Sequence, residues 1–454
     1  MSNLSDLLPA GASGKTIEAV ATANITSKAP VILNSAGTVS PISETAGAMG
    51  TEGAAPGSAK SSGAPGACYH SSEGTVVISF TDASNSNYPY CAVATTSGTT
   101  VTLSTPLVLK SSSCSYNRCA YDSTQNRVVF HYKLNGAGNY AYLRAASLSG
   151  TTFTLGTEIN AFSGTGVGST YGDISNIAAS QVIIVGSVSG TSAQVVSISG
   201  STLTANTAVV VSGAGSYPAR IASGKVGEFL CVLGWYTTSP AMRFVAGTVS
   251  GTTITAGTET VLDTGLSYPC DLASGYWNGH TSPESTYMAA YHPPGGASSS
   301  QVARVITVSG TTLTLGATTA IQDAGSSLTC MGWGNSATQA LYFSRYGANG
   351  YVTELTYSGT TVTKGATTDV GASRYSSNSI VWDQTSSKSV LFYQNGGDSD
   401  AATANCFTPS STNLTATNLL GIASAAILDT ATGTINTWGS RNEVQTSLTI
   451  GSDY

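Results

Sequence analysis

The chain has 454 residues, a formal net charge of −6 and only 9% Asp, Glu, Lys and Arg. The acidic balance and the lack of a basic block exclude non-specific binding to nucleic acid. No stretch approaches eighteen consecutive apolar residues, which excludes insertion of a helix into a membrane. The length is too great for one ordinary hydrophobic core but suits a series of repeated units.

The N-terminal flank, residues 1–63, begins with a polar lead and then holds three strand-like runs, at 16–25, 30–34 and 38–42. The start, MSNLSDLLPAGASGK, lacks a cationic leader followed by an apolar core, so it does not predict a secretory signal peptide. A stretch rich in Gly, Ala, Ser and Pro follows and is typical of a linker. We predict a docking segment that pairs with the C-terminal flank or with a partner chain.

The middle of the chain repeats a Ser-Gly turn that is followed by alternating Thr and apolar residues. The six clear copies and one degenerate copy centre on Gly98, Gly150, Gly200, Gly251, Gly310, Gly359 and Ser411. The apolar residues three positions beyond these centres recur at intervals of 49 to 59 residues. Glycine tolerates the positive φ that tight hairpin turns need. Strand repeats of this length predict a ring of small sheets.

Each repeat contains four strand-like runs, here named a to d, and the Ser-Gly turn joins strands c and d. The pattern predicts an all-β fold, in which residues 64–421 form a seven-bladed β-propeller of four-stranded antiparallel blades. In this phase the seventh blade ends with its own strand d, near residue 421. A parallel β-helix is the structural alternative, although it does not require regular hairpin turns.

The C-terminal flank, residues 422–454, contains three further strand-like runs at 425–430, 434–438 and 446–450. It is too small to bury much surface alone. We therefore predict a small β module that docks onto the N-terminal flank or onto another chain.

The sequence contains no recognisable catalytic constellation, metal-binding spacing or cofactor motif, so we expect no catalytic residues, no metal and no cofactor. Asp122 and Asp383 occupy equivalent a–b turns, where Asp commonly accepts hydrogen bonds from its own backbone. His131 lies within a strand b and is expected to be a packed core residue. The eight cysteines show no CxxC pair and are expected to be free thiols, with a local Cys114–Cys119 bridge as the alternative.

The fifth repeat is longer than the others because its a–b loop, residues 274–285, has extra residues. Tyr276, Trp277 and His280 lie in this loop and are the candidate receptor-binding residues, since exposed aromatic side chains suit contacts with sugars or proteins. The structural alternative is a loop that folds over the rim and fills a gap with Trp277. The b–c loops at 85–88, 135–140 and 292–297 are rich in Gly, Asn and Tyr, a composition that favours adaptable polar recognition.

The unit CAYDSTQNRVVFHYKLNGAGNYAYLRAASLSGTTFTLGTEI, residues 119–159, resembles a propeller repeat of bacteriophage tail-fibre and virion structural proteins. The opening MSNLSDLLPAGASGKTIEAVATA and the segment VILNSAGTVSPI resemble the N-terminus of structural proteins of marine tailed phages. The closing AILDTATGTINTWGSRNEVQTSLTIGSDY is similar to a small β module of the same proteins. That module continues with another strand, so the resemblance implies a truncated end at Tyr454.

The resemblance implies a virion protein that assembles in the host cytoplasm, forms a homo-oligomer, with a trimer favoured, and contacts other virion proteins through its termini. We predict a non-enzymatic tail fibre or exposed appendage that binds a glycan or protein of the host surface. One alternative is a glycan-degrading propeller enzyme of the depolymerase or sialidase type, which requires a carboxylate pair. Another is a purely architectural component of the tail or capsid.

Overall fold

The computed structural model describes residues 16–55, 61–136, 138–162, 172–188, 190–213, 219–233, 241–264, 271–274, 285–291, 293, 300–322, 326–334, 338–347, 349–372, 379–398, 400–414 and 418–437. These residues form β-strands and two short 3₁₀ turns, so the predicted all-β class is confirmed. The chain divides into a larger unit, residues 47–409, and a smaller unit built from both chain ends. Within the described ranges, no helix has the length and apolar character needed to cross a membrane.

The described strands of the larger unit form six sheets that share one antiparallel order. The first sheet contains β7 (Ser61–His70), β8 (Thr75–Asp82), β9 (Tyr88–Ser97), β10 (Thr100–Leu103), β11 (Leu107–Val108), β12 (Cys114–Asp122), β13 (Arg127–Leu134), β14 (Ala141–Ser149) and β15 (Thr152–Asn160). It consists of two four-stranded modules, β7 to β10 and β12 to β15, joined by a parallel bridge between Ala64 and Tyr116, and of β11, which pairs with β9.

The next three sheets each have five strands rather than the predicted four, because the run after the c–d turn is divided into two short strands that both pair with strand c. They are β16 (Asp173–Ala178), β17 (Gln181–Ser187), β18 (Thr191–Ser199), β19 (Thr202–Ala205) and β20 (Val209–Ser212); β21 (Ala219–Ser223), β22 (Glu228–Leu233), β23 (Ala241–Ser250), β24 (Thr253–Ala256) and β25 (Thr260–Thr264); and β26 (Asp271–Ser274), β27 (Ser285–Tyr291), β28 (Gln301–Ser309), β29 (Thr312–Leu315) and β30 (Thr319–Gln322).

The last two sheets complete the unit. They are β31 (Ser326–Trp333), β32 (Gln339–Tyr346), β33 (Asn349–Ser358) and β34 (Thr361–Ala372), and then β35 (Ser379–Asp383), β36 (Lys388–Asn395), β37 (Ala401–Thr408), β5 (Ala48–Met49) and β6 (Gly53–Ala54). The strands within each module are antiparallel, which contradicts the parallel β-helix alternative.

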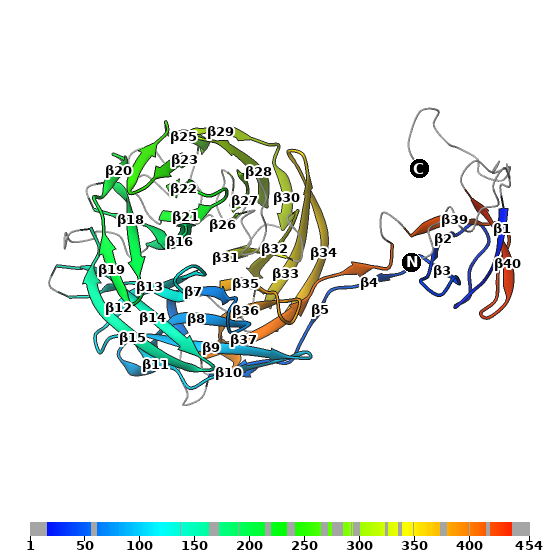
Figure 1. The fold of residues 1–454 in the computed structure, drawn as a ribbon, viewed down its shortest axis with the longest axis horizontal. Helices are drawn as coiled ribbons and strands as arrows, with labels where there is room; N and C mark the ends of the chain where they lie inside the picture. The colour runs from blue at the N-terminus through cyan, green and yellow to red at the C-terminus, as the bar shows by residue number, and fades with distance from the viewer. Residues whose placement is uncertain are drawn as a thin grey trace. The chain divides into compact units, whose positions relative to one another are not determined.

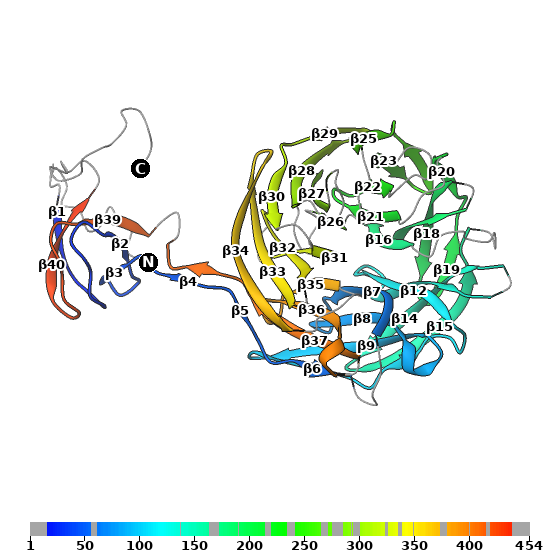
Figure 2. The same ribbon diagram turned by 180° about the vertical axis from the view of Figure 1, so that it is seen from behind.

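The sheets follow one another round a common centre (Figures 1 and 2), an arrangement typical of a β-propeller. The innermost strands contact their neighbours in the order β7, β12, β16, β21, β26, β31 and β35, and β35 contacts β7 in turn. Apolar side chains fill the spaces between sheets. Ile78 and Phe80 of the first sheet, for example, share one core with Val390 and Phe392 of the last.

The predicted c–d hairpins are confirmed, because each of the six glycines has a φ between 55° and 62°. The alternation of Thr and apolar residues after each turn gives the strand one exposed face and one buried face. In β10, Val101 and Leu103 are buried, whereas Thr100 and Thr102 face solvent. Burying one face of such a strand against the neighbouring sheet fixes its register.

Several glycines outside the turns allow neighbouring sheets to approach closely. A Cβ on Gly257, between β24 and β25, would collide with the carbonyl oxygen of Thr311 in the following sheet. The same relationship joins three other glycines to the c–d turn of the next module: Gly156 to Ser201, Gly316 to Thr360 and Gly50 to Thr99. One kind of backbone contact therefore recurs at several sheet boundaries, including the boundary between the last sheet and the first.

The last sheet differs from the prediction, because its outermost strand comes from the N-terminal segment. Strands β5 and β6 pair with β37, and Thr51 forms a parallel bridge to Thr100 of the first sheet. The predicted fourth strand near Ser411 is instead the short β38 (Ser411–Thr412), which pairs with β4 (Glu44–Thr45) in the smaller unit. The degenerate copy lacks the turn glycine, whereas residues 50–52 carry a Gly-Thr-Glu run that also ends other repeats.

The smaller unit contains one sheet drawn from both chain ends, in the order β1 (Thr16–Val20), β40 (Thr432–Thr437), β39 (Leu419–Ala423), β2 (Pro30–Leu33) and β3 (Val39–Pro41). The flanks therefore pair with each other, around a core that includes Val31 and Ile435. The compact units divide at 46/47 and 409/410 rather than at the predicted 63/64 and 421/422. The reason is that the N-terminal segment completes the last sheet of the larger unit, while β39 joins the smaller unit.

Candidate functional site

The predicted receptor-binding residues Tyr276, Trp277 and His280 lie outside the described residues, within 275–284. The strands on either side of this loop, β26 and β27, pair with each other. The loop is therefore an a–b connection, as the repeat pattern predicts.

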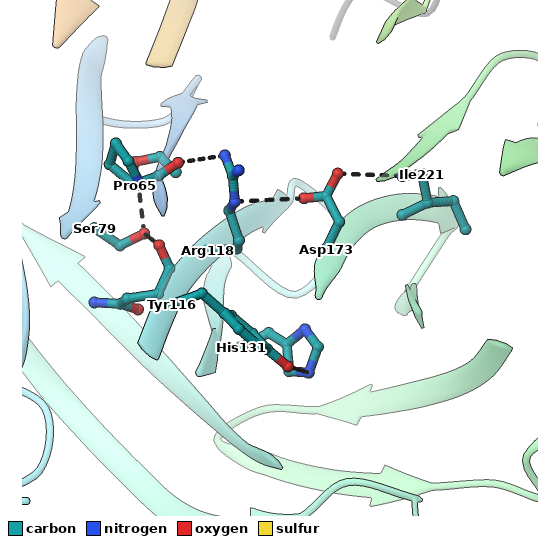
Figure 3. Close-up of polar contacts among 9 residues, drawn as sticks. Pro65, Ser79, Tyr116, Arg118, His131, Asp173 and Ile221 are labelled. Atoms are coloured by element: carbon teal, nitrogen blue, oxygen red, sulfur yellow. Dashed lines mark hydrogen bonds and ion pairs between the residues drawn. The ribbon is translucent and has the colours of Figure 1, made fainter. Parts of the chain in front are cut away.

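A chain of polar contacts crosses the innermost strands of four consecutive modules at the ring centre (Figure 3). Arg118 of β12 donates a hydrogen bond from its guanidinium to the carbonyl oxygen of Pro65 in β7. Its Nε lies 4.0 Å from Oδ1 of Asp173 in β16. The other carboxylate oxygen of Asp173 accepts a hydrogen bond from the backbone N–H of Ile221 in β21, at 3.1 Å.

This network has a structural cause. An innermost strand ends its own module, so one row of its backbone groups has no strand partner within that module and needs other hydrogen-bond partners. Arg118 and Asp173 supply such partners for neighbouring modules. Ser175 of β16 also supplies a partner for a neighbouring module, because its hydroxyl accepts a hydrogen bond from the N–H of Ser223 in β21 at 3.2 Å.

The charges at the ring centre compensate each other. The side chains of Arg118 and Asp173 are only 11% and 15% exposed, and an unpaired charge at this depth would be costly. Burial, followed by the nearby charge of Asp173, raises the pKa of Tyr116. Through their opposite charges and their hydrogen bonds, Arg118 and Asp173 therefore hold neighbouring innermost strands together.

His131 is a packed core residue, as its position in a strand b predicts. It is fully buried, and its Nε2 lies 3.1 Å from the hydroxyl oxygen of Tyr116. Burial lowers the pKa of His131 to about 3. The imidazole is therefore neutral near pH 7 and contributes no charge to a reaction or a ligand.

The acidic residues in the a–b turns have the structural role that the sequence predicts. Asp122 accepts a hydrogen bond from the N–H of Gln125 at 2.7 Å, and Asp383 accepts one from Thr385 at 3.0 Å. Asp122 also accepts from the amide of Asn176 in the next sheet, at 3.2 Å. These carboxylates shape turns and join sheets.

A second set of carboxylates was missed by the sequence analysis. Glu158 accepts from Lys110 at 2.7 Å and also from the hydroxyl of Tyr132. Glu259 forms an ion pair with Arg243 at 2.7 Å and accepts from Ser212, at the end of the preceding sheet. A repeated sequence could have identified these carboxylates, because a Gly-Thr-Glu run occurs at 50–52, 156–158 and 257–259.

The described part of the chain contains no cluster of three or more His, Cys, Asp or Glu that could hold a metal ion. The Gly-rich loop after β36 is a 3₁₀ turn, Gly396–Asp398, in which the side chain of Asn395 accepts from the N–H of Gly397. The described cysteines are buried free thiols. Burial raises the pKa of Cys114 to about 12, which makes this thiol a poor nucleophile.

The chain matches no known protein-family model and no curated protein sequence. Its fold is similar to that of the BP39L lectin from Burkholderia pseudomallei, with a TM-score of 0.56 and 11% identity over 78% of this chain and 98% of the lectin. Another similar structure is the Cps50 (Swd1) β-propeller domain of Myceliophteria thermophila, with a TM-score of 0.44 and 8% identity over 80% of this chain and 99% of that domain. Because the sequence of the lectin is only 11% identical to this chain, the similarity concerns the fold alone.

Proposed function

We propose that this protein is a non-enzymatic, glycan-binding component of a phage virion, in which a seven-bladed propeller contacts the host surface. The observation that carries the binding role is the likeness of the fold to a lectin over 98% of the length of that lectin. The uncharged, Asn- and Tyr-rich loops of the chain suit the same role.

The contacts between the first and the last sheet support a propeller of seven blades. The innermost strands, from β7 to β35, form a series in which the last contacts the first. Across that boundary, the hydroxyl groups of Tyr69 and Thr385 are 2.8 Å apart, and the N–H of Thr51 donates to the carbonyl oxygen of Thr99 at 2.7 Å. Closure protects the apolar faces of the terminal sheets.

The state of the described carboxylates favours binding over hydrolysis. A glycosidase requires one carboxyl group that donates a proton and a second that acts as base or nucleophile. Here Asp173 pairs with Arg118, Glu158 pairs with Lys110, and Asp122 caps its own turn. Each of these acids already has a structural partner.

The virion assignment rests on the resemblance of the repeat and both flanks to phage structural proteins. In this proposal the smaller unit docks onto other virion proteins, the protein forms a trimer, and Tyr276, Trp277 and His280 contribute to host contacts. Several copies on one particle would allow modest affinity at each site to give stable adsorption.

The test is binding of the purified protein to an array of host surface polysaccharides and defined oligosaccharides, with a parallel assay for released reducing ends. We expect saturable binding without release. Release of reducing ends would favour the depolymerase, and failure to bind any glycan would contradict the proposed function. Antibody detection of the protein on purified phage particles tests the virion assignment.

A further inference from the structure

We infer that a site for a neutral glycan lies on the b–c loops of the first two modules, an inference that rests on the proposed function. Both loops enter strand c through the same sequence, Asn-Tyr-x-Tyr. It comprises residues 87–90 in the first module and residues 139–142 in the second. The b–c loops of the other modules do not carry this sequence.

The asparagine that opens each copy has a left-handed backbone. The φ of Asn87 is 58° and that of Asn139 is 48°, and Ser86 beside the first also has a positive φ, at 54°. Such conformations cost energy in residues other than glycine and concentrate at binding sites. Asn is among the few residues that tolerate them, so the motif fixes the direction of both loops.

Hydrogen bonds hold each loop in place. Asp82 accepts from the N–H and the hydroxyl of Ser84, at 2.9 and 2.6 Å, and so caps the 3₁₀ turn Ala83–Asn85. In the second loop, Asn135 donates to the carbonyl oxygen of Ser113 at 2.7 Å. A preorganised surface loses less conformational entropy when a ligand binds.

The two loops lie side by side because both contact one connecting segment. The N–H of Cys114 donates to the carbonyl oxygen of Asn87, at 2.8 Å, in the first loop. The adjacent Ser113 accepts from the side chain of Asn135, at 3.2 Å, in the second loop. The two Asn-Tyr copies therefore belong to one surface.

The four tyrosines of the two copies are all half-buried. Tyr90 stacks on Phe80, with ring centroids 6.0 Å apart, and Tyr142 stacks on Tyr132, at 6.2 Å. The side chain of Asn85 donates to the hydroxyl of Tyr90 at 2.5 Å, and Asn87 and Asn139 are exposed. The two stacked pairs hold the start of strand c in each module and so help to position Tyr88 and Tyr140.

The chemistry of this surface fits a neutral glycan. The loop residues 83–88 and 135–140 include no charged side chain. Exposed amides donate and accept hydrogen bonds and can therefore match paired sugar hydroxyls. Tyrosine offers a flat apolar ring with a polar tip, which suits the C–H face of a sugar. Lys110, which lies near the ring of Tyr142, is neutralised by Glu158.

The test uses the full chain on an array of neutral oligosaccharides containing glucose, galactose, mannose and N-acetylhexosamines. Tyr88→Ala/Tyr140→Ala is expected to weaken binding at least tenfold. The matched control is Tyr351→Ala, which removes a half-buried tyrosine from strand c of another sheet and is expected to leave affinity within twofold.

A second variant keeps the loop backbone while removing the amides. Asn87→Gly/Asn139→Gly retains the positive φ and is expected to weaken binding severalfold without lowering thermal stability, even if the tyrosine variant fails to fold. Undiminished glycan binding by both variants would overturn this inference alone. A wild-type protein that binds no glycan would instead overturn the proposed function, and the inference with it.

Discussion

Glu52 accepts a hydrogen bond from the hydroxyl of Tyr393 at 2.8 Å, across a separation of 341 residues. The same carboxylate accepts from the amide of Asn395 at 3.3 Å. The second module has the same relationship, in which Tyr132 of strand b donates to Glu158 of strand d. The N-terminal segment thus occupies the place of a strand d in the last sheet.

Glu52→Ala is expected to destabilise the larger unit by about 1–3 kcal/mol, because two hydrogen-bond donors lose their acceptor. The measurement is equilibrium unfolding by urea. Glu18→Ala, which changes an exposed residue in the smaller unit, is the control and should have little effect. Equal stability of the two variants would contradict a role for Glu52 in holding the N-terminal segment in the last sheet.

Gly257→Ala is expected to lower the free energy of unfolding by about 1–3 kcal/mol, because the added methyl group must displace the backbone near Thr311. The control, Gly251→Asn, places a side chain in open space on the c–d turn of the same sheet, where Asn tolerates the positive φ. Thermal unfolding of both variants measures the difference. A Gly251→Asn protein less stable than Gly257→Ala would show that the sheet boundary is not tightly packed.

Removal of the Arg118 side chain is expected to lower the free energy of unfolding more than neutralisation of Asp173 does. Arg118→Leu leaves both the Pro65 carbonyl and the Asp173 carboxylate without this partner, at a cost of about 2–3 kcal/mol. Asp173→Asn retains an oxygen that can accept from Ile221. Denaturant unfolding of the single and double variants forms a thermodynamic cycle, in which additive effects would argue against coupling between these residues.

Acid should destabilise the fold in part through His131. Burial lowers the pKa of His131 to about 3, compared with about 6.5 in an unfolded chain. Between these values the unfolded chain binds the additional proton, so stability is lost as the pH falls from about 6.5 towards 3. His131→Gln should reduce the slope of unfolding free energy against pH by up to about 1.4 kcal/mol per pH unit.

The control for this pH dependence is Tyr116→Phe, which removes the hydrogen-bond partner of His131 but keeps the buried imidazole. It should retain the slope of the wild-type protein. A His131→Gln variant with an unchanged slope would show that the acid sensitivity arises elsewhere.

Tyr276→Ala/Trp277→Ala tests the predicted receptor loop. Adsorption of particles that carry the variant to host cells should fall several-fold if the two rings contact the host, because exposed aromatic side chains commonly dominate such contacts. The circular-dichroism melting curve of the purified variant provides the control for folding. Normal adsorption with an unchanged melting curve would remove this loop from the host-binding surface.

The repeated c–d turns could be predicted from the sequence because each depends on two neighbouring residues and on one backbone requirement at glycine. The buried faces of the strands could be predicted because Thr and apolar residues alternate. The outermost strand of the last sheet could not be predicted, because its partner in β37 lies more than three hundred residues away, and the short run at 50–52 is the local sign of that pairing. The degenerate copy at Ser411 was mistaken for the missing strand.

The ring-centre contacts were less accessible to sequence reasoning. Arg118, Asp173 and Ile221 belong to three different repeats, and no spacing within one repeat brings them together. Their contacts depend on how far each innermost strand is displaced relative to the next. The roles of Asp122 and His131 could be inferred, by contrast, because a turn and a strand interior are local environments.

The outer strand that the N-terminal segment supplies to the last sheet also affects the order in which the chain folds during synthesis. The ribosome synthesises residues 48–54 long before β37, the strand that they must join. A nascent chain therefore carries this segment without its strand partner until β37 has been synthesised. Only chains translated beyond residue 408 contain the whole of β37, so the last sheet of the larger unit forms late in synthesis.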